Sequence, residues 1–173
     1  GADGTGPRGQ LAARYGSTLV EGRGLGTRAR AEQGTRTMLA AGPGPELERS
    51  DPGLEAVGEK TGRAGGQVGA GTALKRAANA WIASITAATG QSLAVAKSLG
   101  LDPALFLEAI DGSASDSAYA HTKGKAIIAG SFPAQFALDG LRKDIGLITD
   151  AARSTGGSTV LLHALGRVYA HAR

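Results

Sequence analysis

The longest stretch without a charged residue, from Ala77 to Ala96, limits the possible folds of this chain more than any other feature. It is 20 residues long, which is enough for an α-helix to cross a bilayer. Six polar side chains interrupt it: Asn79, Ser84, Thr86, Thr89, Gln91 and Ser92. Such a segment is too polar for hydrocarbon and is typical of a helix buried inside a protein. We therefore predict one long helix from Thr72 to Leu99 and no membrane partner.

The 28 glycines divide the chain into two unlike parts, because 18 of them lie in residues 1–71. The second part reads as helical throughout. Gly100 ends the long helix, and Asp102-Pro103 supplies the cap and first-turn proline of the next. Further helices are predicted at 116–129, 136–154 and 161–172, and regular apolar spacing along the last two predicts a helical bundle.

The glycine-rich first part offers weaker signals. Residues 10–15 are predicted as a short helix, and residues 17–21 and 36–41 as short strands. Residues 22–26 read as a loop because glycine alternates with other residues. Residues 46–57 are predicted as a helix that Pro52-Gly53 weakens.

Composition and charge exclude several classes of protein. The chain has no cysteine, which excludes disulfides, thiolate metal ligands and a thiol nucleophile, and favours a cytoplasmic location. The net charge is only +4, without a stripe of Lys and Arg or interleaved aromatic residues, so no nucleic-acid partner is expected. The three histidines, His121, His163 and His171, have no second ligand at metal-binding spacing, so no metal site is predicted.

Two lysines are candidates for chemistry. Lys75 and Asn79 lie four residues apart on one helix face. A partly buried lysine with a lowered pKa would act as a general acid or base there, although spacing alone favours an ordinary surface lysine. Lys143 lies opposite the apolar stripe of its helix, where it would reach a ligand or remain a solvated charge.

Two motifs resemble one family. Residues 66–79, GQVGAGTALKRAAN, closely resemble the G-x-x-G-x-G-x-x-x-K-x-x-N-N signature of the β-hydroxyacid dehydrogenases. Residues 132–147 resemble that family's F-x-x-x-F-x-L-x-x-x-x-K-D-x-x-L segment. The resemblance implies a mostly α fold with two domains. Residues 66–173 would form an all-helical domain around one long helix. Residues 1–65 would be the last strands of a Rossmann-type nucleotide-binding domain.

The resemblance also implies a function. It is that of an oxidoreductase that uses NAD or NADP and moves hydride to or from a small β-hydroxyacid or semialdehyde, with Lys75 as general acid and base. The other implied site residues are Asn79 and Gly26 for substrate, and Lys143, Asp144, Gly71 and Phe136 for the cofactor. A homodimer or higher oligomer through the helical domain is the implied assembly.

Four departures from the family pattern leave alternatives open. The family's substrate loop, D-A-P-V-S-G-G, is replaced by EGRGLGT at residues 21–27, and its strand ending in H-V-G by TGRAG at 61–65. A locally shifted reading frame is one hypothesis for both, which a mass-spectrometric peptide containing Gly-Arg-Gly-Leu-Gly would contradict. Ala78 also replaces the first asparagine, and the family's glycine fingerprint for the nucleotide is not found, so we expect the chain to be incomplete. The alternatives are a catalytically incomplete dimerisation module and a protein similar to imine reductases, against which Lys75 argues.

Overall fold

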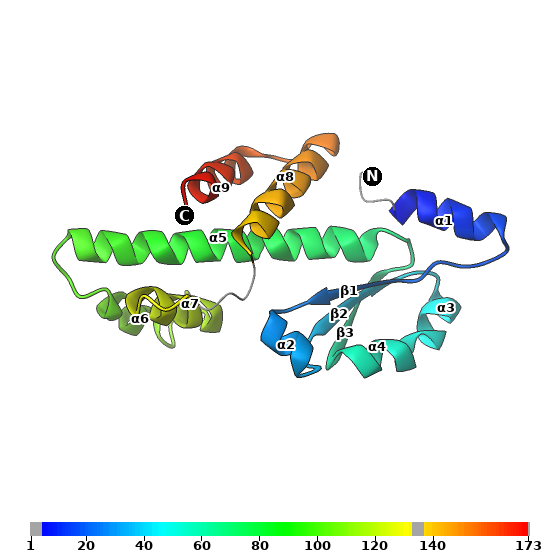
Figure 1. Ribbon diagram of the computed structural model, residues 1–173, viewed down its shortest axis with the longest axis horizontal. Coiled ribbons are helices and arrows are strands. Elements are labelled where there is room, and N and C mark those ends of the chain that lie inside the picture. The colour runs from blue at the N-terminus through cyan, green and yellow to red at the C-terminus, as the bar shows by residue number, and fades with distance from the viewer. Residues whose placement is uncertain (1–4, 133–136, 173) are drawn as a thin grey trace.

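The computed structural model describes residues 5–132 and 137–172. Helices alternate with three strands in its first part, and only helices follow. The first part contains α1 (Thr5–Arg14), β1 (Glu21–Leu25), α2 (Arg28–Glu32), β2 (Thr37–Ala41), α3 (Gly44–Arg49), α4 (Asp51–Val57) and β3 (Lys60–Gly65). The second contains α5 (Ala70–Ser98), α6 (Ala104–Ile110), α7 (Ala118–Ile128), α8 (Leu138–Ser154) and α9 (Val160–His171). The expected fold, mostly α with strands ahead of one long helix, is confirmed (Figure 1).

The three strands form one sheet in the order β1-β2-β3. β1 runs antiparallel to β2, whereas β3 is parallel to β2 and is reached through the crossover helices α3 and α4. The central strand β2 is predicted from its sequence and buries its residues 38–41. The single helix predicted over 46–57 is divided at Ser50, two residues before Pro52, whose ring cannot continue a helix.

The loop predicted at 22–26 is wrong, because residues 21–25 form β1. The strand predicted at 17–21 is also wrong, because residues 17–20 lie outside any strand. The glycine-rich residues 60–65 likewise form β3. Both segments pair their backbones with β2, and backbone hydrogen bonds do not depend on which side chains a strand carries. The glycines therefore make these strands hard to predict from the sequence, but they do not prevent the strands from forming.

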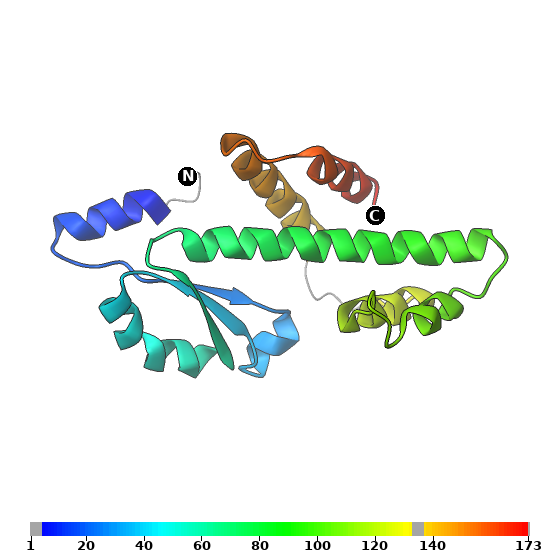
Figure 2. The same cartoon turned by 180° about the vertical axis from the view of Figure 1, so that it is seen from behind.

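Helix α5 is the central element of the fold and contacts all three strands and the four helices that follow it. Its 29 residues span roughly 43 Å at 1.5 Å per residue. Figures 1 and 2 show α8 and α9 on one side of it, with the sheet and the α6–α7 pair along the other. The start of α5 requires glycine twice. Gly69 has φ +105°, and a Cβ on Gly71 would lie 3.0 Å from the Leu39 carbonyl oxygen.

Two apolar clusters hold these layers together. Under the sheet, Met38 and Ala40 pack with Leu47 and Leu54 from the crossover helices. Between the long helices, Ala83 of α5 packs with Ile145, Leu165 and Tyr169. The Tyr169 hydroxyl donates a 2.8 Å hydrogen bond to the Ala83 carbonyl oxygen, which satisfies a polar group inside this cluster.

The predicted apolar stripes have different outcomes. On α8, Ile145 and Ile148 are buried as predicted. On α9, Leu165 of the predicted stripe is buried, but Leu161 and Val168 are exposed, and Tyr169, which lies outside the stripe, is buried as well. The aromatic ring of Tyr169 fills the space against α5, so the buried face is rotated from the predicted one. In the part of the chain that the structure describes, no helix is both long and apolar enough to span a bilayer.

Candidate functional site

A small cavity of about 250 Å³ lies where the start of α5 meets β1 and α8. Its lining is unusually rich in charged and polar side chains for so small a space. The lining residues are Arg23, Thr72, Lys75, Arg76, Asn79, Asp144, Leu147 and Ile148. Three of the residues predicted for the site, Lys75, Asn79 and Asp144, are therefore brought together.

Lys75 is half-buried in this wall and is held by the sheet. Its Nζ donates a 2.7 Å hydrogen bond to the backbone carbonyl oxygen of Gly24 in β1. Burial lowers the pKa of the ammonium group below its ordinary value of 10.5. The Asp144 carboxylate opposes this shift, and the positive charges of Arg23 and Arg36 add to it.

Asn79 lies one helical turn beyond Lys75 and connects α5 to α8. Its Nδ2 donates a 3.0 Å hydrogen bond to Asp144 Oδ2. Asn79 and Asp144 are 65 positions apart, so only the packing of the two helices creates this contact. The bond fixes the carboxylate on the wall of the cavity that contains Lys75.

A buried carboxylate, Glu21, is bonded to two of the residues that line the cavity, Arg23 and Thr72. Its Oε2 accepts a 2.9 Å hydrogen bond from the backbone N–H of Gly69, and its Oε1 accepts from the Thr72 hydroxyl and from Arg23 Nε. Burial alone would raise the pKa of Glu21, but these hydrogen bonds and the Arg23 charge hold it below its ordinary value. Glu21 is thus ionised and attaches β1 to the first turn of α5.

The other predicted site residues lie outside the cavity lining. Gly71 is buried against the Leu39 carbonyl, so tight packing accounts for its lack of a side chain. Gly26 follows β1 with φ +144°. Lys143 is exposed on α8 beside Asp144, and Phe136 lies outside the described residues. The assignments of these four residues remain predictions.

Sequence reasoning missed Glu21, Arg23 and Thr72. The signal was present, because Glu21 and Arg23 lie in the segment that departs from the family's substrate loop. Treating that segment as a loop hid the alternation of β1, which presents Glu21 and Arg23 on the same face of the strand.

Comparison with known sequences decides the family. The sequence model described as "NAD-binding of NADP-dependent 3-hydroxyisobutyrate dehydrogenase" matches residues 69–173, more than half of the chain. The chain belongs to this family. The match covers the helices that the resemblance to the β-hydroxyacid dehydrogenases predicted, so that resemblance is confirmed.

Relatives extend the similarity into the first part of the chain. Glyoxylate/succinic semialdehyde reductase 2, chloroplastic, of Arabidopsis thaliana is 29% identical over 89% of this chain and 43% of its own length. An L-threonate dehydrogenase of Cupriavidus necator is 30% identical over 84% of this chain and 49% of its own length. The chain thus spans less than half the length of these curated relatives.

A solved structure supports the same assignment. The Mycobacterium tuberculosis 3-hydroxyisobutyrate dehydrogenase, determined with L-serine, superposes with a TM-score of 0.86 at 25% sequence identity. The superposition covers 96% of this chain and 59% of that one. The sheet and the helices around α5 therefore both follow the fold of a hydroxyisobutyrate dehydrogenase.

The described residues of this family member fit a nicotinamide dinucleotide only in part. The cavity of about 250 Å³ suits a small acid and is too small for a dinucleotide. The exposed ammonium group of Lys143, beside the cavity residue Asp144, suits the anionic groups of such a cofactor. The described residues thus offer a small polar cavity and, at the position of α8 just before Asp144, an exposed lysine.

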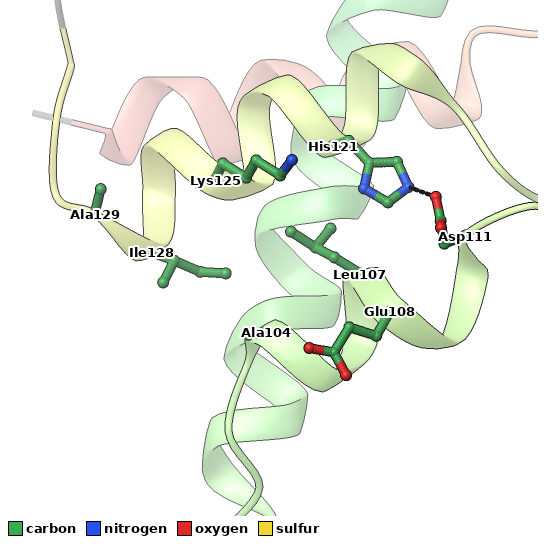
Figure 3. Close-up of a pocket in the computed structure, with 8 residues that line it drawn as sticks. All are labelled: Ala104, Leu107, Glu108, Asp111, His121, Lys125, Ile128 and Ala129. Carbon is green, nitrogen blue, oxygen red and sulfur yellow. Dashed lines mark ion pairs between the residues drawn. The ribbon is translucent and has the colours of Figure 1, made fainter.

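A second cavity, of about 400 Å³, lies between α6 and α7 (Figure 3). None of the predicted site residues lines it. At its edge, His121 Nε2 lies 2.8 Å from Asp116 Oδ1 and 3.6 Å from Asp111 Oδ1. These three groups lie close enough together to hold a metal ion, which differs from the expectation that the histidines lack neighbouring ligands. A search by histidine spacing missed them because both partners are aspartates of the preceding loop.

Proposed function

We propose that this chain supplies the substrate cavity of an oxidoreductase that uses NAD or NADP and acts on a small β-hydroxyacid or semialdehyde. The observation that carries this proposal is the half-buried Lys75 in a small polar cavity, one turn from the Asn79–Asp144 pair. The names of its relatives, semialdehyde reductase and threonate dehydrogenase, support the same substrate class. Residues 1–65 and 66–173 would act as its two domains.

Lys75 would exchange the proton of the reaction. A bound nicotinamide dinucleotide would supply hydride in the reducing direction and take it up in the oxidising one. In reduction the Lys75 ammonium would donate its proton to the carbonyl oxygen, and in oxidation the neutral amine would accept the hydroxyl proton. The lowered pKa of Lys75 supports both roles, because it brings the two protonation states closer together in free energy at neutral pH.

Asn79 would orient the substrate and Lys75. Its amide is already held by Asp144, so its carbonyl oxygen has a defined direction in the cavity. Lys143, Asp144, Gly71 and Phe136 would contact the cofactor, and Gly26 the substrate. The lysine favours hydroxyacid or semialdehyde chemistry over that of the imine reductases.

Binding of NADH and NADPH to the purified full-length protein tests this function. We expect the nicotinamide fluorescence to change on titration, and turnover of succinic semialdehyde or of L-threonate to follow. A protein that neither binds the dinucleotides nor turns over either acid would exclude the proposed activity. A stable oligomer in that case would support the dimerisation module instead.

We also propose that the helical domain forms a homodimer. Trp81 on α5 is 62% exposed, and the residues around the α5–α6 turn, Leu99, Leu101 and Leu105, are all about half exposed or more. Apolar groups of this size are common at protein interfaces. Light scattering of the wild type and of Trp81→Glu tests this, with loss of a dimer expected for the variant.

The cytoplasmic location remains a prediction, since one relative is named as chloroplastic.

A further inference from the structure

We propose that Arg23 binds the carboxylate of the substrate and selects for it. This inference rests on the proposed function and concerns the end of the substrate that does not react. Arg23 lines the same cavity as Lys75 and Asn79, and it reaches the cavity from β1 rather than from a helix. In the family's loop the corresponding position is a proline, so the cation is a feature of this chain.

The charge of the cavity favours an anion. Three of its lining residues, Arg23, Lys75 and Arg76, are cationic, and Asp144 is the anionic one. The ionised Glu21, which is bonded to Arg23 but does not line the cavity, leaves a balance of one positive charge. Asp144 is further engaged by Asn79. A small acid would place its carboxylate against this excess of positive charge while its carbonyl or hydroxyl group faced Lys75.

Arg23 is held in position before any substrate arrives. Its Nε lies 2.9 Å from Glu21 Oε1 and 2.9 Å from Thr72 Oγ1. Glu21 is buried, whereas the Arg23 side chain keeps 36% of its surface exposed. A guanidinium carries five N–H donors in a planar fork, which binds a carboxylate while other partners are kept. Side chains fixed in this way lose little entropy on binding a ligand.

The geometry assigns separate tasks to the two cations. Lys75 is bonded to the Gly24 carbonyl, in the residue that follows Arg23. Arg23 thus reaches the cavity from β1, and the Lys75 ammonium group, from α5, is bonded to the next residue of that strand. Removing Arg23 should impair recognition of the acid, whereas removing Lys75 should impair proton transfer.

Two ligands of equal size, one anionic and one neutral, test the inference without any turnover. Butyrate carries the carboxylate, and butyramide is its neutral analogue of equal size. In ligand-observed NMR titrations of the full-length protein, we expect the wild type to prefer butyrate. Arg23→Gln should weaken butyrate binding by about tenfold to a hundredfold and leave butyramide unchanged, since charged hydrogen bonds contribute this much to affinity.

Arg63→Gln is the matched control. Arg63 lies on β3, pairs with Asp51 and does not line the cavity, so both ligands should bind it as they bind the wild type. If Arg23→Gln unfolds because Glu21 loses its partner, Arg23→Lys tests the role of Arg23 in its place. A lysine keeps the positive charge but lacks the planar set of guanidinium donors. An intermediate loss of butyrate affinity, with an unchanged melting temperature, is expected for it.

Turnover distinguishes this proposal from the proposed function. In Arg23→Gln, KM for succinic semialdehyde should rise, and kcat/KM for butanal, which lacks the carboxylate, should stay constant. Equal binding of butyrate and butyramide by the wild type would overturn the role of Arg23, whatever the turnover. Selective butyrate binding without turnover of any acid would overturn the oxidoreductase and retain the carboxylate site.

Discussion

The Lys75 ammonium group donates a 2.7 Å hydrogen bond to the backbone carbonyl of Gly24, 51 positions earlier in the chain. This contact joins the long helix to the edge strand of the sheet. It places a cation with a lowered pKa on the wall of a cavity that also contains Asn79 and Asp144. The candidate site is therefore a property of the interface between the sheet and the helices.

Replacing Lys75 should abolish proton transfer. We expect Lys75→Met to lower kcat by about a hundredfold or more, since general acid–base catalysis contributes roughly 10²–10⁴-fold. Steady-state kinetics of the full-length protein with succinic semialdehyde measure this. Lys97→Met, in the exposed last turn of the same helix, should keep the wild-type rate. An unchanged kcat for Lys75→Met would remove Lys75 as the catalyst.

The pH dependence of reduction should follow Lys75. Reduction requires the protonated ammonium group, so the rate should fall as the pH rises through its lowered pKa. The Asp144 carboxylate raises that pKa, so Asp144→Asn should move the fall to lower pH. Asp150→Asn, on the exposed face of α8, serves as the control and should leave the profile in place. A shift to higher pH in Asp144→Asn would contradict the electrostatic assignment.

Glu21 should stabilise the fold in a pH-dependent way. Its pKa in the folded protein is lower than its ordinary value of 4.5, so its stabilising effect is complete above pH 4.5 and disappears as the pH falls through the folded value. Glu21→Gln should lower the free energy of unfolding by about 1–3 kcal/mol at neutral pH, since three donors lose a charged acceptor. Urea denaturation at neutral and acidic pH measures this.

The exposed Glu32→Gln is the control for Glu21, because Glu32 pairs only across one helical turn with Arg28. It should change the stability by less than about 0.5 kcal/mol. Equal stability of Glu21→Gln and wild type at neutral pH would show that the buried carboxylate does not fasten β1 to α5.

Two helical glycines should respond to alanine with opposite signs. A Cβ on Gly124 in α7 would lie 2.7 Å from Leu107 Cδ2, and Leu107 is buried. Gly124→Ala should therefore destabilise the protein by about 1–3 kcal/mol through overpacking. Gly146 in α8 has no heavy atom within 4 Å of that position, so Gly146→Ala should stabilise by up to about 1 kcal/mol. Thermal unfolding of the two variants compares them, and stabilisation by both would contradict the packing of α6 on α7.

The helices of the second part were predictable because their signals are local, whereas α2 was not predicted. Gly100 has φ +80° at the end of α5, and Asp102 Oδ1 accepts a hydrogen bond from the Ala104 N–H where α6 begins, as the sequence predicts. The β1 and β3 strands were not predictable. Both strands are held by backbone hydrogen bonds to β2, and their glycines lack the alternating apolar side chains by which a strand is predicted from sequence.

The sequence by itself determined the long helix, the helical bundle, the family and the candidate Lys75–Asn79 pair. These follow from periodicity, caps and motifs, which act over a few residues. Only the tertiary structure decided three contacts. Asn79 donates a hydrogen bond to Asp144, Thr72 donates one to Glu21, and Arg23 lines the cavity. Each of these contacts joins residues about 50 or more positions apart, and the packing of α5 against the sheet and α8 is the physical cause that brings them together.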